Sequence, residues 1–284
     1  MATVETFSGQ TGTWCPGCGD WGIGISIKQA FSQMGLEPSS VCVVFDIGCS
    51  GNMNDVLNAY AMHGLHGRSL TYAVGMKMAN HKFPVVAVGG DGGLYGEGGN
   101  HFLHACRGNH DITMLVHDNS VYGLTTGQVA PTAFKGFKSK STPDGIIEVN
   151  VNPLALALTQ GATFIAQAFA GDVGHLISMI KAGMEHKGFS LVNVLQPCVT
   201  FNKVNTYQYY MKRVYKLPAD YDNTNFKSAL EKTIEVNEEK YPLGIIYKND
   251  RPAFHELLPQ IKPDIPLINN PPFKDLELLM DEFI

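Results

Sequence analysis

The sequence has no run of about 18 consecutive apolar residues, the length that a membrane-spanning helix requires, so no membrane span is expected. It also has no excess of positive charge. Its 21 Lys and Arg residues stand against 26 Asp and Glu, which argues against a nucleic-acid-binding surface. The first residues, MATVETFSGQTGTW, have neither the basic nor the apolar region of a signal peptide. We therefore expect a cytoplasmic protein.

Charged residues are sparse, at 17% of 284 residues, whereas 44% are hydrophobic. A chain of this length buries a sizeable core, and its low charge suggests that a partner covers part of its surface. There are no internal repeats and no low-complexity segments. Glycine is abundant, with 30 residues concentrated before position 130. Because glycine collects where backbone bends sharply or approaches a ligand, we expect the functional site in the first half.

Strand-like and helix-like segments alternate along the first 195 residues. Apolar, β-branched runs at 41–46, 84–90, 112–119, 162–169 and 190–195 predict buried strands. The segments at 21–34, 69–81, 99–108, 153–160 and 172–187 predict helices between them. This alternation indicates an α/β fold, a doubly wound, mostly parallel sheet covered by helices on both faces.

The character of the chain changes after Pro197. Residues 201–223 are aromatic and basic, a helix is predicted near 226–239 and a short strand at 243–247, and the end is rich in proline. We therefore divide the chain into a main domain, 1–199, and a C-terminal extension, 200–284. The extension is expected to pack on the main domain or on a partner instead of forming a second domain.

Two predicted strands end in residues suited to a diphosphate and a magnesium ion. One ends at Gly90-Asp91-Gly92-Gly93 and the other at Asp118-Asn119. A carboxylate, an amide oxygen and a backbone carbonyl just beyond Asn119 could form one face of an Mg²⁺ octahedron. The glycines leave backbone N–H groups bare for a diphosphate. A glycine-rich turn with a helix-capping Asp is the alternative explanation of the first motif.

Four of the six cysteines lie in loops and could bind a metal. Cys15 and Cys18, in TWCPGCGDWGIG, have thioredoxin-like spacing, but no apolar strand precedes them and no matching cis-Pro loop is evident. Cys49 and Cys198 each follow a predicted strand, and four thiolates suit a [4Fe–4S] cluster. Structural zinc is the alternative that spacing leaves open. Two further cysteines lie within predicted elements and are expected to be buried small hydrophobic residues: Cys42 and Cys106.

Seven ordered blocks resemble the β subunits of 2-oxoacid:ferredoxin oxidoreductases, the branch acting on 2-oxoglutarate or several 2-oxoacids. They run from about Trp14 to Lys216 and read WCPGCG, DIGCSGN, HGLHGR, GDGGLYGEGGNH, DNSVYGLTTGQ, HKGFS and QPCVTFNK. The resemblance implies the thiamine-diphosphate-binding type of sheet within 1–199. It also implies CoA-dependent oxidative decarboxylation of a 2-oxoacid, 2-oxoglutarate or pyruvate, with one-electron transfers through a [4Fe–4S] cluster to ferredoxin. The reverse reaction is reductive carboxylation.

The resemblance also implies roles for individual residues. Asp91, Asn119 and the carbonyl of Val121 resemble Mg²⁺ ligands. The residues that resemble the cluster ligands are Cys15, Cys18, Cys49 and Cys198. The residues that resemble or adjoin the thiamine-diphosphate contacts are Ile47, Gly48, Cys49, Ser50, His66, Arg68, Gly90, Asp91, Gly92, Gly93, Asn119, Val121, Tyr122, Gly123, Leu124 and Thr125.

No glutamate of this chain is expected to activate the thiamine ring. In the family that glutamate is supplied by the α subunit, so the chain should be inactive alone and have its site at an interface, in a hetero-oligomer such as (αβ)₂. Glu97 is expected to be a local helix cap. His63 could contact the diphosphate or the substrate carboxylate, or it could be a histidine of the helix surface or of an interface without a role in the site. Some members have Lys at the position of Thr126, in the loop 123–132 that is expected to line the substrate pocket, so the substrate preference stays open.

The extension contains four cations that could steer an acidic ferredoxin: Lys203, Lys212, Arg213 and Lys216. A solvated face or a contact with the α partner would explain them equally well. Two other functions remain as alternatives. One is a clusterless thiamine-dependent 2-oxoacid decarboxylase component. The other is a redox or metal-binding module without enzyme activity, which would leave the GDGG and HGLHGR motifs unexplained.

Overall fold

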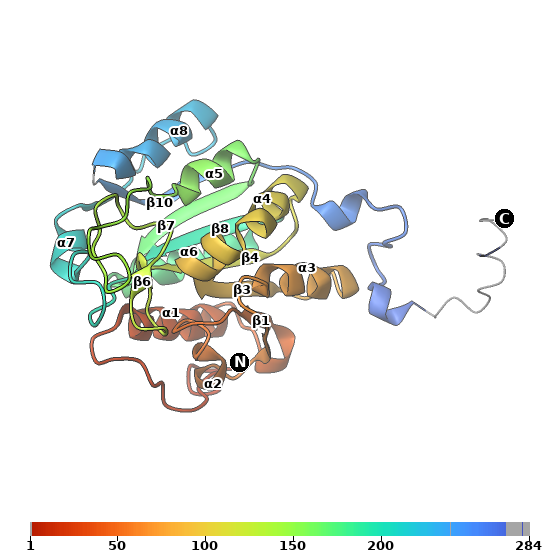
Figure 1. Cartoon of the computed structure of the whole chain (residues 1–284). Helices are drawn as coiled ribbons and strands as arrows, with labels where there is room; N and C mark the ends of the chain where they lie inside the picture. The colour runs from red at the N-terminus through yellow and green to blue at the C-terminus, as the bar shows by residue number, and fades with distance from the viewer. Residues whose placement is uncertain (1, 239, 271–279, 281–284) are drawn as a thin grey trace.

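The computed structural model describes residues 2–238, 240–270 and 280. An eight-stranded sheet in the order β2-β1-β3-β4-β8-β7-β10-β9 forms its centre (Figure 1). Its first six strands are parallel and β10 is antiparallel to β7, which confirms the predicted α/β fold. The strands are β1 (Cys42–Phe45), β2 (Tyr60–His63), β3 (Val85–Gly90), β4 (Thr113–Asp118), β7 (Phe164–Phe169), β8 (Ser190–Leu195), β9 (Val214–Lys216) and β10 (Tyr241–Lys248).

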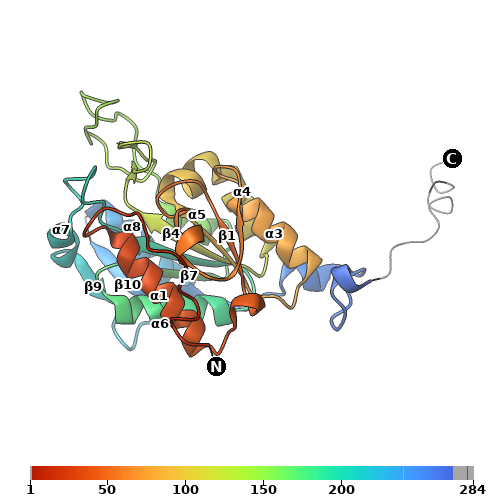
Figure 2. The ribbon, with the colours of Figure 1, turned by 90° about the horizontal axis from the view of Figure 1, so that it is seen from below.

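Helices cover both faces of the sheet because its strands are apolar on both sides. The helices α1 (Gly19–Gln33) and α6 (Val173–Glu185) pack side by side on one face, as Figure 2 shows. The other face is covered by α3 (Ser69–Ala79), α4 (Gly99–Gly108) and α5 (Pro153–Thr159). Alternate strand residues enter the two cores: Val43 and Phe45 face α1, whereas Cys42 and Val44 face the opposite layer. Cys42 and Cys106 are buried as expected.

Shorter elements complete the chain. They are α2 (Met53–Val56), α7 (Tyr207–Met211), α8 (Phe226–Ile234), the hairpin of β5 (Val121–Tyr122) and β6 (Gln128–Val129), a π-helical turn at Gly92–Glu97 and 3₁₀ turns at Pro38–Ser40, Glu235–Glu238, Phe254–Leu257 and Leu267–Asn269. In the part of the chain that the structure describes, no helix combines the length and apolarity needed to span a bilayer.

Three features of the sheet escape sequence reasoning, the first being the unpredicted edge strand β9. The edge strand β2 lacks an apolar pattern because three of its four residues are exposed. Strand β10, predicted only as a short segment, pairs along β7 with a register shift between Ile245 and Tyr247. The segment after residue 199 therefore contributes to the central sheet, although the division at 199 stays a prediction. Glu239, the predicted end of the 226–239 helix, lies outside the described residues, as do 271–279 and 281–284 of the predicted extension.

Candidate active site

A cavity of about 510 Å³, counting the space open to solvent, lies at the carboxyl ends of β1, β3 and β4. In parallel sheets this edge is where ligands bind. The cavity brings together all the residues predicted to contact thiamine diphosphate except Arg68. The Arg68 guanidinium instead donates hydrogen bonds to the carbonyls of Gly67 and Glu97, at 3.1 and 3.0 Å. One further residue, His117, lines the cavity and was not predicted.

The glycines after Asp91 are required by close contacts. A Cβ on Gly92 would lie 2.4 Å from the Tyr122 ring, and one on Gly93 would lie 2.7 Å from the Asp46 carboxylate. No side chain larger than hydrogen fits at either position without movement of its neighbours. Both glycines line the cavity, where their backbone N–H groups carry no side chain of their own that could block a bound diphosphate.

The three predicted Mg²⁺ donors, Asp91, Asn119 and Val121, line this same cavity. The Asp91 carboxylate accepts hydrogen bonds from the Ser120 backbone N–H, at 2.8 Å, and from the Thr132 hydroxyl. Burial, and secondarily the charge of Asp118, raise the pKa of Asp91 well above its usual value. A divalent cation would relieve this cost, so the donor set of one carboxylate, one amide and one carbonyl fits Mg²⁺.

Two polar atoms lining the cavity are buried without a hydrogen-bond partner among the described residues, Ser50 Oγ and His117 Nε2. The other ring nitrogen of His117, Nδ1, lies 2.6 Å from the buried Asp20 carboxylate. Asp20 thus occupies Nδ1, and the unpartnered Nε2 is the ring nitrogen left for a ligand of the cavity. Unpartnered buried polar atoms in a cavity are what a polar ligand would satisfy.

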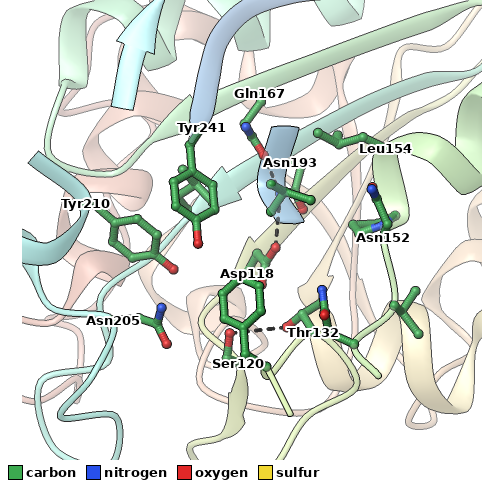
Figure 3. Close-up of a pocket in the computed structure, with 16 residues that line it drawn as sticks. Asp118, Ser120, Thr132, Asn152, Leu154, Gln167, Asn193, Asn205, Tyr210 and Tyr241 are labelled. Atoms are coloured by element: carbon green, nitrogen blue, oxygen red, sulfur yellow. Dashed lines mark hydrogen bonds between the residues drawn. The ribbon is translucent and has the colours of Figure 1, made fainter. Parts of the chain in front are cut away.

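Asp118 faces away from this cavity, because successive residues of a strand point to opposite sides. It lines a second cavity of about 430 Å³, again counting open solvent. Figure 3 shows its carboxylate accepting a hydrogen bond from Asn193, at 3.1 Å, with Tyr210 and Tyr241 directing their hydroxyls toward the same space. The same alternation places His117 beside Asn119. Because side chains alternate along the predicted strand 112–119, His117 falls on the same side as the predicted ligand Asn119. This alternation is the signal that could have identified His117.

The four predicted cluster cysteines approach the cofactor cavity from three loops. All six cysteines are free thiols, and Cys49 itself lines the cavity. A Cβ on Gly123 would lie 3.2 Å from the Cys49 sulfur and 3.8 Å from the Cys198 sulfur, so this glycine leaves space between them. Burial, with the charges of Asp20, Cys198 and Cys15, raises the pKa of Cys49 to about 12. Cys49 therefore has Cys198 and Cys15 nearby, and Cys198 also interacts with Cys18.

Tryptophan side chains hold the cysteine loops in place. Trp14 donates from Nε1 to the Cys49 carbonyl at 2.7 Å, and Trp21 donates to the Cys15 carbonyl at 3.1 Å. Across the described residues, no three His, Cys, Asp or Glu side chains form a ready site for a single ion. Each cysteine of a [4Fe–4S] cluster binds a different iron atom, so its ligands stand further apart. The four free thiols therefore fit a cluster as a donor set.

Glu97 does not cap the following helix, contrary to expectation. The N-cap of α4 is Gly98, without a side-chain hydrogen bond, and the Glu97 carboxylate instead accepts from the Tyr122 hydroxyl at 3.1 Å. It also lies 3.6 Å from Nε2 of His66, whose Nδ1 is 2.8 Å from the Asp46 carboxylate. His63 contacts the Asp46 carbonyl, at 3.2 Å, and does not line the cavity. The contacts of Glu97 and Asp46 thus hold two residues that line the cavity, His66 and Tyr122.

The cations of the extension differ in their surroundings. Lys216 forms an ion pair of 2.9 Å with Asp172, and the Arg213 guanidinium stacks 4.0 Å from the centre of the Tyr209 ring. Lys203 donates to the Val199 carbonyl, whereas Lys212 is exposed to solvent. A carboxylate offsets the charge of Lys216, so electrostatic steering by this segment would rest less on Lys216 than on Lys203 and Lys212, for which the described residues provide no such ion pair.

The fold and the cavity together define a cofactor-binding domain of the thiamine-diphosphate enzymes. Residues 46–194 match the family described as thiamine pyrophosphate enzyme, C-terminal TPP binding domain. Residues 198–263 match the family described as the C-terminal part of the pyruvate ferredoxin oxidoreductase β chain.

Whole-chain comparisons narrow this class to one family. The chain is 42% identical over 278 residues to the 2-oxoacid:ferredoxin oxidoreductase β subunit of Saccharolobus solfataricus, covering 93% of this chain and 90% of that one. It is 40% identical to the 2-oxoglutarate oxidoreductase subunit KorB of Mycobacterium tuberculosis, over 69% of this chain and 52% of that one. The chain belongs to the 2-oxoacid:ferredoxin oxidoreductase β-subunit family, as the sequence motifs predicted.

A solved structure shows the same architecture. It is a 2-oxoglutarate:ferredoxin oxidoreductase from Magnetococcus marinus with 2-oxoglutarate, coenzyme A and succinyl-CoA bound. The two chains superimpose with a TM-score of 0.86 at 37% identity, over 89% of this chain and 87% of that one.

Proposed function

We propose that the chain is the β subunit of a CoA-dependent 2-oxoacid:ferredoxin oxidoreductase, with 2-oxoglutarate as the favoured substrate and pyruvate as a possible second one. The net reaction converts a 2-oxoacid and CoA to acyl-CoA, CO₂, a proton and two electrons, and it is reversible. The observation that carries the proposal is Cys49, which lines the cofactor cavity and adjoins the other cysteines. An electron acceptor placed there would lie next to the oxidised carbon.

The residues of the cavity have distinct roles in this proposal. Thiamine diphosphate, when bound, supplies the carbon nucleophile for the 2-oxo carbon and accepts the charge that CO₂ leaves behind. Asp91, Asn119 and the Val121 carbonyl hold Mg²⁺, and the bare backbone around Gly92 binds the diphosphate. Ser50 Oγ and His117 Nε2 bind polar atoms of the cofactor or substrate. The four cysteines hold the [4Fe–4S] cluster, through which electrons pass singly to ferredoxin.

The partner in this proposal is an α subunit that closes the cavity and supplies the activating glutamate. Among the described residues that line the cavity there is no glutamate. Two large apolar side chains of its lining, Ile47 and Leu124, are 38% and 48% exposed. Exposed apolar side chains at a cofactor site favour coverage by another protein. We infer an assembly such as (αβ)₂, located in the cytoplasm, where free cysteines persist.

Ferredoxin docking is proposed at the exposed lysines after Cys198. Lys212→Glu should lower the rate of ferredoxin reduction, and the loss should shrink as salt rises. Lys212→Arg is the control, since it keeps the positive charge and should leave the rate of ferredoxin reduction unchanged. Unchanged ferredoxin rates in Lys212→Glu would reject this docking site while leaving the reaction untouched.

The reaction is tested by co-producing the chain with its α subunit without oxygen and supplying a panel of 2-oxoacids. We expect CoA-dependent reduction of ferredoxin, fastest with 2-oxoglutarate, and acyl-CoA as the product. Decarboxylation without CoA or an electron acceptor would instead indicate a clusterless decarboxylase component. Zinc in place of iron in the purified complex would contradict the cluster.

A further inference from the structure

Gln196 joins the proposed Mg²⁺ ligand Asn119 to the cysteine Cys18. Its side chain is 1% exposed and lies between β8 and the start of α1. Asn119 Nδ2 donates to Gln196 Oε1 at 2.8 Å, and Gln196 Nε2 donates to the Cys18 sulfur at 3.2 Å. Asn119 and Cys18 are thereby connected through a single side chain, although Gln196 is 178 residues from Cys18 in sequence.

The direction of these hydrogen bonds is set by the backbone. The N–H of Val121 can only donate, and it donates to Asn119 Oδ1 at 3.0 Å. Since Oδ1 of Asn119 faces Val121, its Nδ2 faces Gln196 and donates. Gln196 must accept through Oε1, and its Nε2 is therefore the atom that faces the Cys18 sulfur. Each amide orientation follows from the one before it. Gln196 consequently donates a hydrogen bond to Cys18 and does not accept one.

The surrounding fold makes space for this contact. A Cβ on Gly19 would lie 2.6 Å from Gln196 Cγ, so the first residue of α1 has to be small for the glutamine to lie over it. The Gly19 N–H donates to the Pro197 carbonyl at 3.1 Å, which fixes the two segments against each other. The Cys18 sulfur also contacts the Asp20 carboxylate, at 3.2 Å. A Cys18 thiolate would be destabilised by the negative charge of Asp20, whereas the hydrogen bond from Gln196 would stabilise it.

We propose that Gln196 is a positioning residue that orients Asn119 in the cofactor site and raises the reduction potential of the cluster by donating to Cys18. This inference rests on the cluster and the Mg²⁺ site of the proposed function. A hydrogen bond to a cluster sulfur stabilises the reduced, more negative state, so its removal lowers the potential. Loss of the same side chain leaves the Asn119 amide held only by the Val121 N–H, which weakens the binding of magnesium and thiamine diphosphate.

The test uses the assembled α–β complex and the variant Gln196→Met, which keeps the length of the side chain but has no amide. We expect the equilibrium constant for one-electron reduction of the cluster to fall about tenfold. This corresponds to a midpoint potential lower by ~59 mV. We expect the dissociation constant of thiamine diphosphate with Mg²⁺ to rise about tenfold. Gln167→Met is the matched control. It removes another amide that is 2% exposed, one that contacts neither the cofactor cavity nor a cysteine.

A second measurement uses the wild-type complex, so its outcome does not depend on whether Gln196→Met folds. Pulsed EPR of the reduced complex, with glutamine labelled with ¹⁵N in its side chain, should detect one weakly coupled nitrogen. Absence of that coupling, or a potential and an affinity in Gln196→Met equal to those of the wild type, overturns the inference. A wild-type complex without iron would instead overturn the proposed function itself.

Discussion

Asp20, at the start of α1, and His117, in β4, form a 2.6 Å hydrogen bond, although 97 residues separate them. Both side chains are almost fully buried, at 0% and 1% exposure. Asp20 also contacts the Cys18 sulfur, and His117 lines the cofactor cavity. The cysteine loop and the cavity are thus parts of one buried polar network. Substitution of His117 in the cavity should therefore alter the surroundings of Cys18.

Ser50→Ala should have opposite effects on stability and on cofactor binding. The Ser50 hydroxyl is buried without a partner among the described residues, which costs about 1–3 kcal/mol. Its removal should raise the melting temperature of the cofactor-free chain and weaken thiamine-diphosphate binding about tenfold. Thermal unfolding and calorimetric titration measure the two effects. Ser178→Ala, at an exposed helix position, is the control. Equal thiamine-diphosphate affinity in Ser50→Ala and the wild type would show that the Ser50 hydroxyl does not bind the cofactor.

Gly92→Ala should abolish cofactor binding while the fold persists. The added methyl group would lie 2.4 Å from the Tyr122 ring and displace this ring, which lines the cavity. We expect at least a roughly hundredfold loss of thiamine-diphosphate affinity, about 2.7 kcal/mol, by calorimetry. The matched variant Gly99→Ala, where a Cβ meets nothing within 4 Å, should bind normally. Normal binding by both variants would place the diphosphate elsewhere.

Gly123→Ala should reduce the iron content of the purified complex. The methyl group would enter the space between the sulfurs of Cys49 and Cys198, 3.2 Å from the nearer one. Iron and acid-labile sulfide analysis should show most of the cluster lost. Gly75→Ala, in open surroundings on α3, should keep full iron content. A full complement of iron in Gly123→Ala would contradict the proposed position of the cluster.

Three buried or half-buried histidines should lower the stability of the fold as the pH drops below about 7. Burial lowers the pKa values of His110, His186 and His255, so the folded chain binds protons less readily than the unfolded chain. Their contribution to stability is complete above the unfolded histidine pKa, about 6.5, and is lost as the pH falls through it toward the lower folded values. Melting temperatures between pH 7.5 and 5.5 should decline less steeply in His186→Asn. Identical slopes in the two proteins would contradict this assignment.

Sequence reasoning predicted the central strands because they are apolar on both faces, and it predicted Asp91 and Asn119 because they follow two of those strands. Most of the other cavity residues were predicted from the resemblance to the family. It missed β2, an exposed edge strand without a pattern, and it took Glu97 for a helix cap although Tyr122 binds its carboxylate. Arg68, predicted to adjoin the cofactor, does not line the cavity, and one of its guanidinium nitrogens donates to two carbonyls. Such contacts depend on tertiary packing, which no local spacing encodes.

The central claim is that electrons from the 2-oxoacid enter a [4Fe–4S] cluster held beside the cofactor by Cys15, Cys18, Cys49 and Cys198. EPR spectra of the oxygen-free α–β complex, taken before and after addition of 2-oxoglutarate, test it most directly. We expect the signal of a reduced [4Fe–4S] cluster to appear on addition of substrate and to be absent in Cys198→Ala. A complex that consumes 2-oxoglutarate while its iron signal stays unchanged, or that holds no iron, would contradict the claim.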